Sequence, residues 1–289
     1  MSKQLAWKLA LICAIIAAIC GSIPFAIADD KKEIPDHTNF TACETCHANK
    51  QKMWEASGHS KAINPVLKNE KAPADCYGCH SSEGFAAKRQ GNKVDISRKN
   101  TFHTVSCLTC HDPRNSKLPH KLVADAGELC DSCHPQREVL KGQGARGIDD
   151  VRNVHSAVAC ASCHMTEGNH LMKVLRPDDP NLSEKRIDTC TACHKDNNGK
   201  ARAKQLQDWQ SEFKEKMDGL QTDVNAMDAV LKEKPEVLNA DLKKKFDDLK
   251  FNLSNLVREG SHGAHNFDYA MEIMDAASKD LREIKAAAK

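Results

Sequence analysis

The sequence predicts a mainly α-helical fold with almost no sheet, in which a loop-rich segment with short helices precedes three long helices. From Gly199 onward, apolar residues recur at spacings of three and four, which is the period of an amphipathic helix. Before that point, no stretch alternates apolar and polar residues for more than a few positions, as a half-buried strand would. The early segment also carries one cysteine motif many times, which predicts short helices around a cofactor.

This motif, Cys-x-x-Cys-His, occurs six times between residues 43 and 194. Two thiols at this spacing form thioethers to the two vinyl groups of one porphyrin, and the adjacent histidine becomes the proximal iron ligand. The sequence therefore predicts six covalently attached haem c groups. The thioether cysteines are Cys43, Cys46, Cys76, Cys79, Cys107, Cys110, Cys130, Cys133, Cys160, Cys163, Cys190 and Cys193, and the proximal ligands are His47, His80, His111, His134, His164 and His194.

A zinc site and a thioredoxin-like redox pair are the alternatives for a Cys-x-x-Cys pair. Zinc knuckles do not require a histidine directly after the second cysteine, and a redox pair would occur once rather than six times. The motifs hold 12 of the 14 cysteines, and the other two, Cys13 and Cys20, lie near the N-terminus. No thiol of the mature chain remains for a disulfide.

Residues 35–196 contain all six motifs in about 27 residues per haem, too few to build a separate apolar core around each. The porphyrins themselves must supply most of the buried apolar surface. We therefore expect a haem domain at 29–198 and a helical domain at 199–289.

Three helices are expected in the second domain. The first ends at Pro235, the second runs from a cap at Asn239 to Gly260, and the third begins near Phe267. Short links favour an antiparallel hairpin with a returning third helix. Exposed parts of the apolar stripes suggest that a homodimer could form through these helices.

The N-terminus predicts a signal peptide at 1–28 and a periplasmic location. Lys3 and Lys8 precede an apolar run, and Ala26-Ile27-Ala28 forms a cleavage site. An uncleaved membrane anchor, which would leave the protein membrane-bound or at the cell surface, and lipidation at Cys20 are the alternatives. Cleavage would leave 40 basic and 40 acidic residues, with no basic stripe suited to nucleic acid.

Eight histidines lie outside the motifs, which is enough to supply a second axial ligand to each iron. His103 and His155 shortly precede a motif, and we expect each to reach the iron of a neighbouring haem. His59, His120 and His170 follow motifs and are further candidates for distal ligands. His37 lies near the new N-terminus and His262 shares a turn with His265, so these two are reserves.

Several segments together resemble the multihaem cytochrome superfamily that includes cytochrome c nitrite reductase, octahaem tetrathionate reductase and hydroxylamine oxidoreductase. They are Trp54-x-x-Ser-x-His59, Cys107-Leu-Thr-Cys-His-Asp-Pro, Cys160-Ala-Ser-Cys-His-Met and Gly263-Ala-His265-Asn266-Phe-Asp-Tyr269-Ala270. The resemblance implies that His265, rather than His262, is a distal ligand supplied from the helical region.

The chain departs from those enzymes in its active-site motifs. It has no Cys-x-x-Cys-Lys motif, which ammonia-forming nitrite reductases use, and it is much shorter than they are. A hydroxylamine-oxidising site needs a tyrosine that cross-links to haem, and the two tyrosines are Tyr77 and Tyr269. The resemblance therefore implies the scaffold more firmly than the catalysis.

Together these features favour an extracytoplasmic hexahaem carrier that passes electrons through mostly bis-histidine haems in anaerobic-type respiration. Its expected partners are other redox proteins, such as cytochromes or a membrane quinol-oxidising complex. The alternatives are a small reductase of nitrite, hydroxylamine or tetrathionate with one open haem, and a conductive, filament-forming structural cytochrome.

Overall fold

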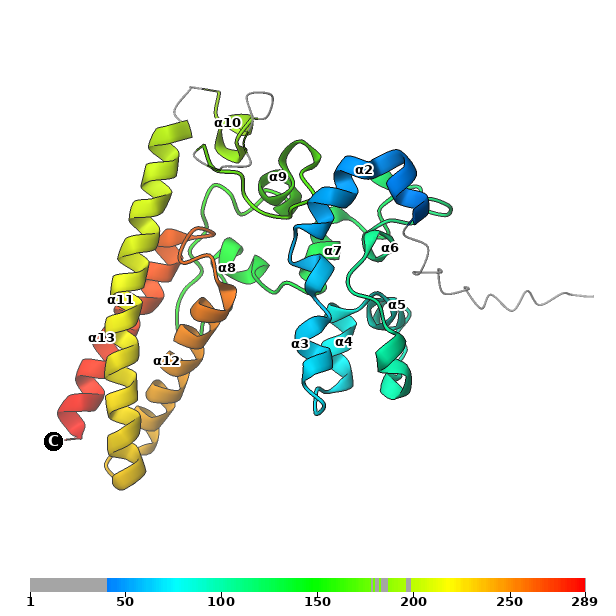
Figure 1. Ribbon diagram of the computed structural model, residues 1–289. Helices are drawn as coiled ribbons and strands as arrows, with labels where there is room; N and C mark the ends of the chain where they lie inside the picture. Colours follow the sequence, from blue (N-terminus) through cyan, green and yellow to red (C-terminus); the bar gives the residue numbers. More distant parts are fainter. Residues whose placement is uncertain (1–40, 178, 180–181, 183–186, 196–198, 289) are drawn as a thin grey trace, which may run out of the picture. The chain divides into compact units, whose positions relative to one another are not determined.

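The computed structural model describes residues 41–177, 179, 182, 187–195 and 199–288, which all belong to one compact unit, 36–289 (Figure 1). The expectations for the 1–28 leader, for Cys13 and Cys20 and for His37 lie outside these residues. Within the described residues every regular element is a helix, and the only ladder-type pairing is an isolated bridge between His111 and Leu122. The mainly α, loop-rich fold class predicted from the sequence is confirmed.

The N-terminal part consists of short helices joined by loops (Figure 1). Each described motif lies on or at the end of one α-helix, because one helical turn places cysteines three residues apart on the same face. The elements are α2 (Thr41–Glu55), η1 (His59–Lys61), α3 (Asn64–Lys68), α4 (Ala74–His80), α5 (Ser82–Arg89), η2 (Ile96–Thr101), α6 (Cys107–Cys110), η3 (Pro119–Lys121), α7 (Ala126–Asp131), α8 (Arg137–Lys141), α9 (Cys160–His164), η4 (Thr166–Gly168) and α10 (Thr189–Cys193).

Three long helices follow: α11 (Gly199–Glu233), α12 (Ala240–Glu259) and α13 (Phe267–Ala287). The side chain of Asn239 caps α12 by accepting a hydrogen bond from the Leu242 amide, and Gly260 ends it in the left-handed conformation. The predicted ends of these helices are therefore confirmed. At 35 residues, α11 is longer than its apolar stripe predicted, because the segment before Leu206 is rich in good helix formers.

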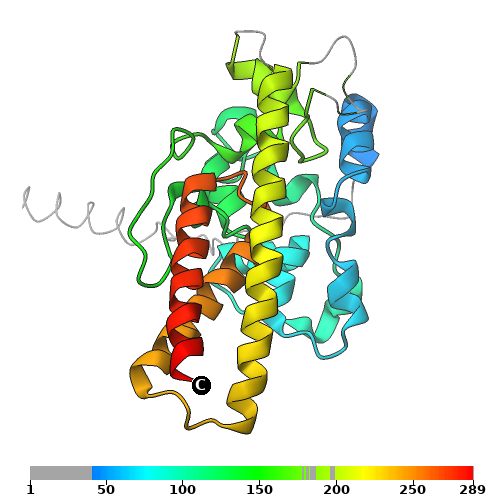
Figure 2. The same ribbon diagram turned by 90° about the vertical axis from the view of Figure 1, so that its left-hand side faces the viewer.

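The apolar stripes of these helices form the main core. Both α11 and α12 pack against α13, and Figure 2 shows α11 and α13 running side by side along most of their length. The fully buried members include Phe246, Leu256, Met274, Leu281 and Ile284. Since each large apolar side chain contributes about 1.5–3 kcal/mol when buried, this core, rather than the exposed ion pairs between the helices, holds the three together.

Buried polar side chains of the helices hold a loop of the motif-bearing segment. Asn252 accepts a hydrogen bond from the Arg146 amide and donates one to the Arg146 carbonyl, at 2.8 and 2.9 Å. The Tyr269 hydroxyl accepts from the Ala145 amide at 2.8 Å, and Asn266 donates to the Val151 carbonyl at 2.6 Å. Losing such a bond would leave a buried polar group unsatisfied, so these contacts fix the helices against the 142–153 loop.

Gly142 is expected to be essential to this contact. It has φ +71°, and a β-carbon there would lie 1.8 Å from the Val151 carbonyl oxygen and 2.9 Å from Nδ2 of Asn266. Gly142→Ala should therefore lower the free energy of unfolding by about 2–4 kcal/mol through backbone strain and overpacking. Thermal unfolding of the haem-loaded protein measures the change.

Gly91→Ala is the matched control. Gly91 has the same φ, +71°, but an added β-carbon meets nothing within 4 Å. Gly91→Ala should lower the free energy of unfolding only through backbone strain, by about 1–2 kcal/mol. Equal losses in the two variants would show that the contact with Val151 and Asn266 does not matter.

Candidate haem-binding site

Four motif histidines each face a second histidine across a similar gap. The ring centroids are 5.9 Å apart for His59 and His134, 6.3 Å for His111 and His170, 6.3 Å for His155 and His194, and 6.1 Å for His164 and His265. Metal–imidazole bonds are about 2.0 Å long in zinc sites, so two rings on opposite sides of one metal atom have centroids about 6 Å apart. The four pairs fit an iron held between two axial histidines.

The expected ligands in these pairs come from distant parts of the chain. His155 precedes the fifth motif and faces His194 of the sixth. His59 follows the first motif and faces the fourth, and His170 follows the fifth and faces the third. His265 comes from the turn between α12 and α13 and faces His164.

The chemical state of the paired histidines suits iron binding. Burial is the main reason that the pKa is lowered from its ordinary value in four of them, His59, His134, His164 and His170. A lowered pKa keeps the imidazole neutral, which is the form that binds a metal.

Hydrogen bonds to one ring nitrogen leave the other nitrogen available. Nδ1 of His80 donates to the Ala62 carbonyl at 2.6 Å, Nδ1 of His111 to the His120 carbonyl at 2.8 Å, and Nδ1 of His170 to the Gly168 carbonyl at 2.8 Å. A carbonyl accepts only, so Nδ1 carries the proton and Nε2 is free to bind iron. The fold therefore sets the tautomer as well as the position.

Three other predicted residues have different surroundings. His262 has φ +55°, and its ring lies 5.8 Å from the ring of Phe213. His120 also has φ +55°, is exposed, and supplies its backbone carbonyl to His111. Nδ1 of His103 lies 2.5 Å from the carboxylate of Glu83. Among the described residues, no ring contact between histidines involves His120 or His262.

Two proximal candidates, His47 and His80, also lack a ring contact with another histidine in the part of the chain that the structure describes. His47 lies exposed on α2, and His80 is half-buried at the end of α4. His37, one of the reserve ligands, lies outside the described residues. The geometry therefore accounts for both axial positions at four motifs.

The cysteine thiols show which motifs are neighbours. The Cys107 thiol of the third motif lies near Cys43 of the first, and Cys110 of the third motif lies near Cys130 and Cys133 of the fourth. Cys133 also meets Cys79 of the second motif. Cys130 of the fourth motif also lies near Cys160 of the fifth. Cys163 of the fifth motif lies near Cys190 and Cys193 of the sixth.

These neighbouring cysteines place the six motifs in a branched spatial order. The first, third, fourth, fifth and sixth motifs follow one another, and the second joins at the fourth. No disulfide joins any of the twelve described cysteines. Burial is the largest cause that raises the pKa of Cys110 to about 12 and of Cys130 and Cys133 to about 11, and neighbouring thiols add to it.

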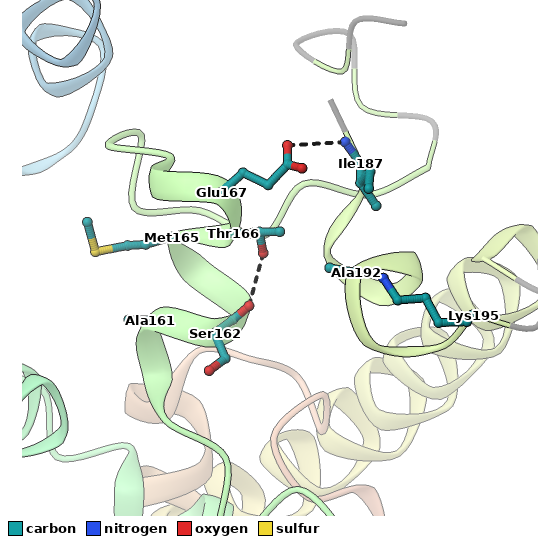
Figure 3. A pocket seen from close by; sticks show the side chains of 8 residues that line it. All are labelled: Ala161, Ser162, Met165, Thr166, Glu167, Ile187, Ala192 and Lys195. Atoms are coloured by element: carbon teal, nitrogen blue, oxygen red, sulfur yellow. Dashed lines mark hydrogen bonds between the residues drawn. The ribbon is translucent and has the colours of Figure 1, made fainter. Parts of the chain in front are cut away.

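A shallow cavity of about 450 Å³ lies between α9 and α10, the helices of the fifth and sixth motifs (Figure 3). Its lining includes Ala161, Ser162 and Ala192, which stand between the two cysteines of their motifs. Thr166 donates a hydrogen bond to the Ser162 carbonyl at 3.0 Å, which fixes one wall. None of the lining residues is a histidine or cysteine.

Both tyrosines are buried in packing positions. Tyr77 is fully buried, with its ring edge-on to Phe102, and Tyr269 is 1% exposed in the core of the long helices. No group of three or more histidine, cysteine, aspartate or glutamate side chains among the described residues is arranged to hold a bare metal ion. No helix in that part of the chain is long and apolar enough to cross a bilayer.

Comparison with known proteins indicates which cofactor these motifs bind. A family described as "Doubled CXXCH motif" matches residues 101–139, and a family described as "Cytochrome c554 and c-prime" matches 42–112. The chain is a multihaem c-type cytochrome. Its paired motifs indicate covalently bound haem c.

This cytochrome is similar to parts of three larger proteins. It is 26% identical over 177 residues to cytochrome c nitrite reductase subunit NrfA of Nitratidesulfovibrio vulgaris, which is 50% of this chain and 30% of that protein. The outer cell wall cytochrome OcwA matches 80% of this chain and 50% of its own, with a TM-score of 0.67 and 26% identity. An undecahaem cytochrome from the S-layer of Carboxydothermus ferrireducens matches 78% and 40%, with a TM-score of 0.54 and 23% identity.

The cytochrome thus spans half or less of each of these proteins. The first is named as a nitrite reductase subunit and the other two by their place in the cell envelope. Their fold supports the assignment of this scaffold, which the resemblance noted in the sequence also implied.

Proposed function

We propose that this cytochrome is an extracytoplasmic electron carrier with six haem c groups, most of them held between two histidines. The observation that carries the proposal is the set of four histidine pairs, each with the spacing of two ligands on one iron. An iron with both axial positions filled exchanges electrons without binding a substrate.

The neighbouring thiols support a path between the haems. Each cysteine is attached to the rim of its porphyrin, so cysteines of two motifs that lie near each other bring two haem rims close together. The proposed path runs through the haems of the first, third, fourth, fifth and sixth motifs, with the second as a branch at the fourth. The motif cysteines Cys46 and Cys193 at the two ends of this path are exposed, which suits transfer to a partner.

The partners proposed are other redox proteins, including cytochromes or a membrane quinol-oxidising complex, which dock weakly at the ends of this path. Weak docking matches the small interfaces of transient electron-transfer encounters. Export to the periplasm or cell surface fits the thioether chemistry, because haem c is attached outside the cytoplasmic membrane.

We expect six haems per chain, and we expect most of the haem irons to be low-spin. Mass spectrometry of the purified protein should show the mature polypeptide plus six haems, because all six motifs are intact. Electron paramagnetic resonance of the oxidised protein should show low-spin signals from at least the four paired irons.

Two results would contradict this proposal. A mass gain other than six haems would refute the count. High-spin signals at most of the irons would refute bis-histidine ligation, and a single high-spin iron that binds nitrite or hydroxylamine would favour the reductase.

A further inference from the structure

We propose that Glu259 is a positioning residue for His265, and that its negative charge lowers the reduction potential of the haem held by the fifth motif. The inference rests on the proposed function, because it takes His265 as the ligand opposite His164. Glu259 would give this haem a reduction potential different from those of the other haems along the path.

Glu259 is one of the few buried acidic residues. It is the last residue of α12, and its side chain is 3% exposed. One carboxylate oxygen is hydrogen-bonded to Nδ1 of His265, and the other accepts from the amide and hydroxyl of Ser261 at 3.1 and 2.8 Å. The His265 amide in turn donates to the Ser261 hydroxyl at 3.1 Å, so residues 259–265 close on themselves.

Packing alone does not account for a carboxylate at this place. Burial disfavours a charged group, and the C-terminus of a helix carries a partial negative charge that disfavours an anion further. Within the described residues, the donors of Ser261 and the ring of His265 offset both costs. A neutral side chain would fit the same helix end at no such cost, which indicates that the charge serves the histidine.

The contact has two effects on His265. It holds the ring so that its other nitrogen, Nε2, can face His164, and it makes that nitrogen a stronger electron donor. A stronger donor stabilises oxidised iron over reduced iron, so the reduction potential falls. His170, by contrast, donates its Nδ1 proton to the neutral carbonyl of Gly168. The haem of the fifth motif should therefore have a lower potential than it would with a carbonyl in place of Glu259.

The test is Glu259→Gln in the full haem-loaded protein, followed by potentiometric titration and electron paramagnetic resonance. The amide keeps an oxygen that accepts from Nδ1 but removes the charge. One midpoint potential should rise while every iron stays in its original spin state. Glu272→Gln is the matched control, because Glu272 is exposed on α13 and, among the described residues, no hydrogen bond links it to a ligand histidine.

Ser261→Ala provides a change of opposite sign. It removes one donor from the carboxylate, so more of the negative charge acts on His265 and the same potential should fall. Shifts in the same direction for Glu259→Gln and Ser261→Ala would indicate a distorted turn and would overturn the role of charge.

The role of Glu259 and the ligation by His265 can be tested separately. Unchanged potentials in Glu259→Gln, together with a new high-spin iron in His265→Ala, would overturn the inference and leave the ligation intact. A fully low-spin His265→Ala protein would instead overturn the ligation on which the inference rests.

Discussion

Loss of the haem of the fourth motif is expected to separate the remaining haems into three groups. The variant Cys130→Ala/Cys133→Ala removes both thioether attachments of this motif. Its cysteines lie near those of the second, third and fifth motifs, so this motif is the branch point of the path. The haems of the first and third motifs, of the second, and of the fifth and sixth should then lose their common neighbour.

This variant should also be less stable. The haem supplies buried apolar surface between several motifs, and removing a buried group at least as large as an aromatic side chain costs about 3–5 kcal/mol. We expect a protein with five haems and a lower unfolding temperature. Mass spectrometry gives the haem count, and thermal unfolding gives the loss of stability.

The decisive measurement is rapid mixing with less reductant than the haems can accept, monitored by haem absorbance. The matched control is Cys190→Ala/Cys193→Ala, which removes the terminal haem of the sixth motif and leaves the other five connected. The control should redistribute electrons in one phase, whereas the fourth-motif variant should do so in separate phases. Identical kinetics in the two five-haem proteins would exclude the fourth motif as the branch point.

The ends of the long helices could be predicted because their signals are local. Asn239 caps α12 through a residue three positions away, and Gly260 ends the same helix through its own left-handed conformation. The haem attachments are just as local, since each motif needs one helical turn. For these features the sequence contains all the physical information that is needed.

The pairing of histidines could not be predicted in the same way. Two motifs lie between His59 and the motif of His134 in the sequence, and the distance between the two histidines depends on how the intervening loops fold. Position after a motif also misleads, because His170 faces a second histidine whereas His120 offers only its carbonyl to His111. The branch at the fourth motif likewise arises from contacts between distant thiols, and no spacing in the sequence encodes it.

The second large effect is expected from His265, in the turn between α12 and α13. Replacing His265 with alanine should leave the iron of the fifth motif with one axial histidine. The structure places the His265 ring 6.1 Å from that of His164, and Asn153 donates a hydrogen bond to the His265 carbonyl at 2.7 Å, so the backbone should keep its course. The expected result is one new high-spin signal and a raised potential for that haem.

The shift should be on the order of 0.1 V, a fraction of the ~0.8 V over which axial ligands move haem potentials. His262→Ala is the matched control, since it removes a histidine from the same turn. The His262 ring packs against Phe213 and contacts no other histidine among the described residues. It should therefore cost some packing and leave every iron low-spin.

The comparison of these two variants decides which histidine of the turn binds iron. A high-spin signal in His262→Ala, with His265→Ala fully low-spin, would reverse the assignment and show that the turn adopts another arrangement around the haem. A high-spin signal confined to His265→Ala would tie the helical region to the haem path by a bond to iron. The long helices would then act as a ligand-bearing part of the cytochrome, and their packing on the 142–153 loop would determine where that ligand lies.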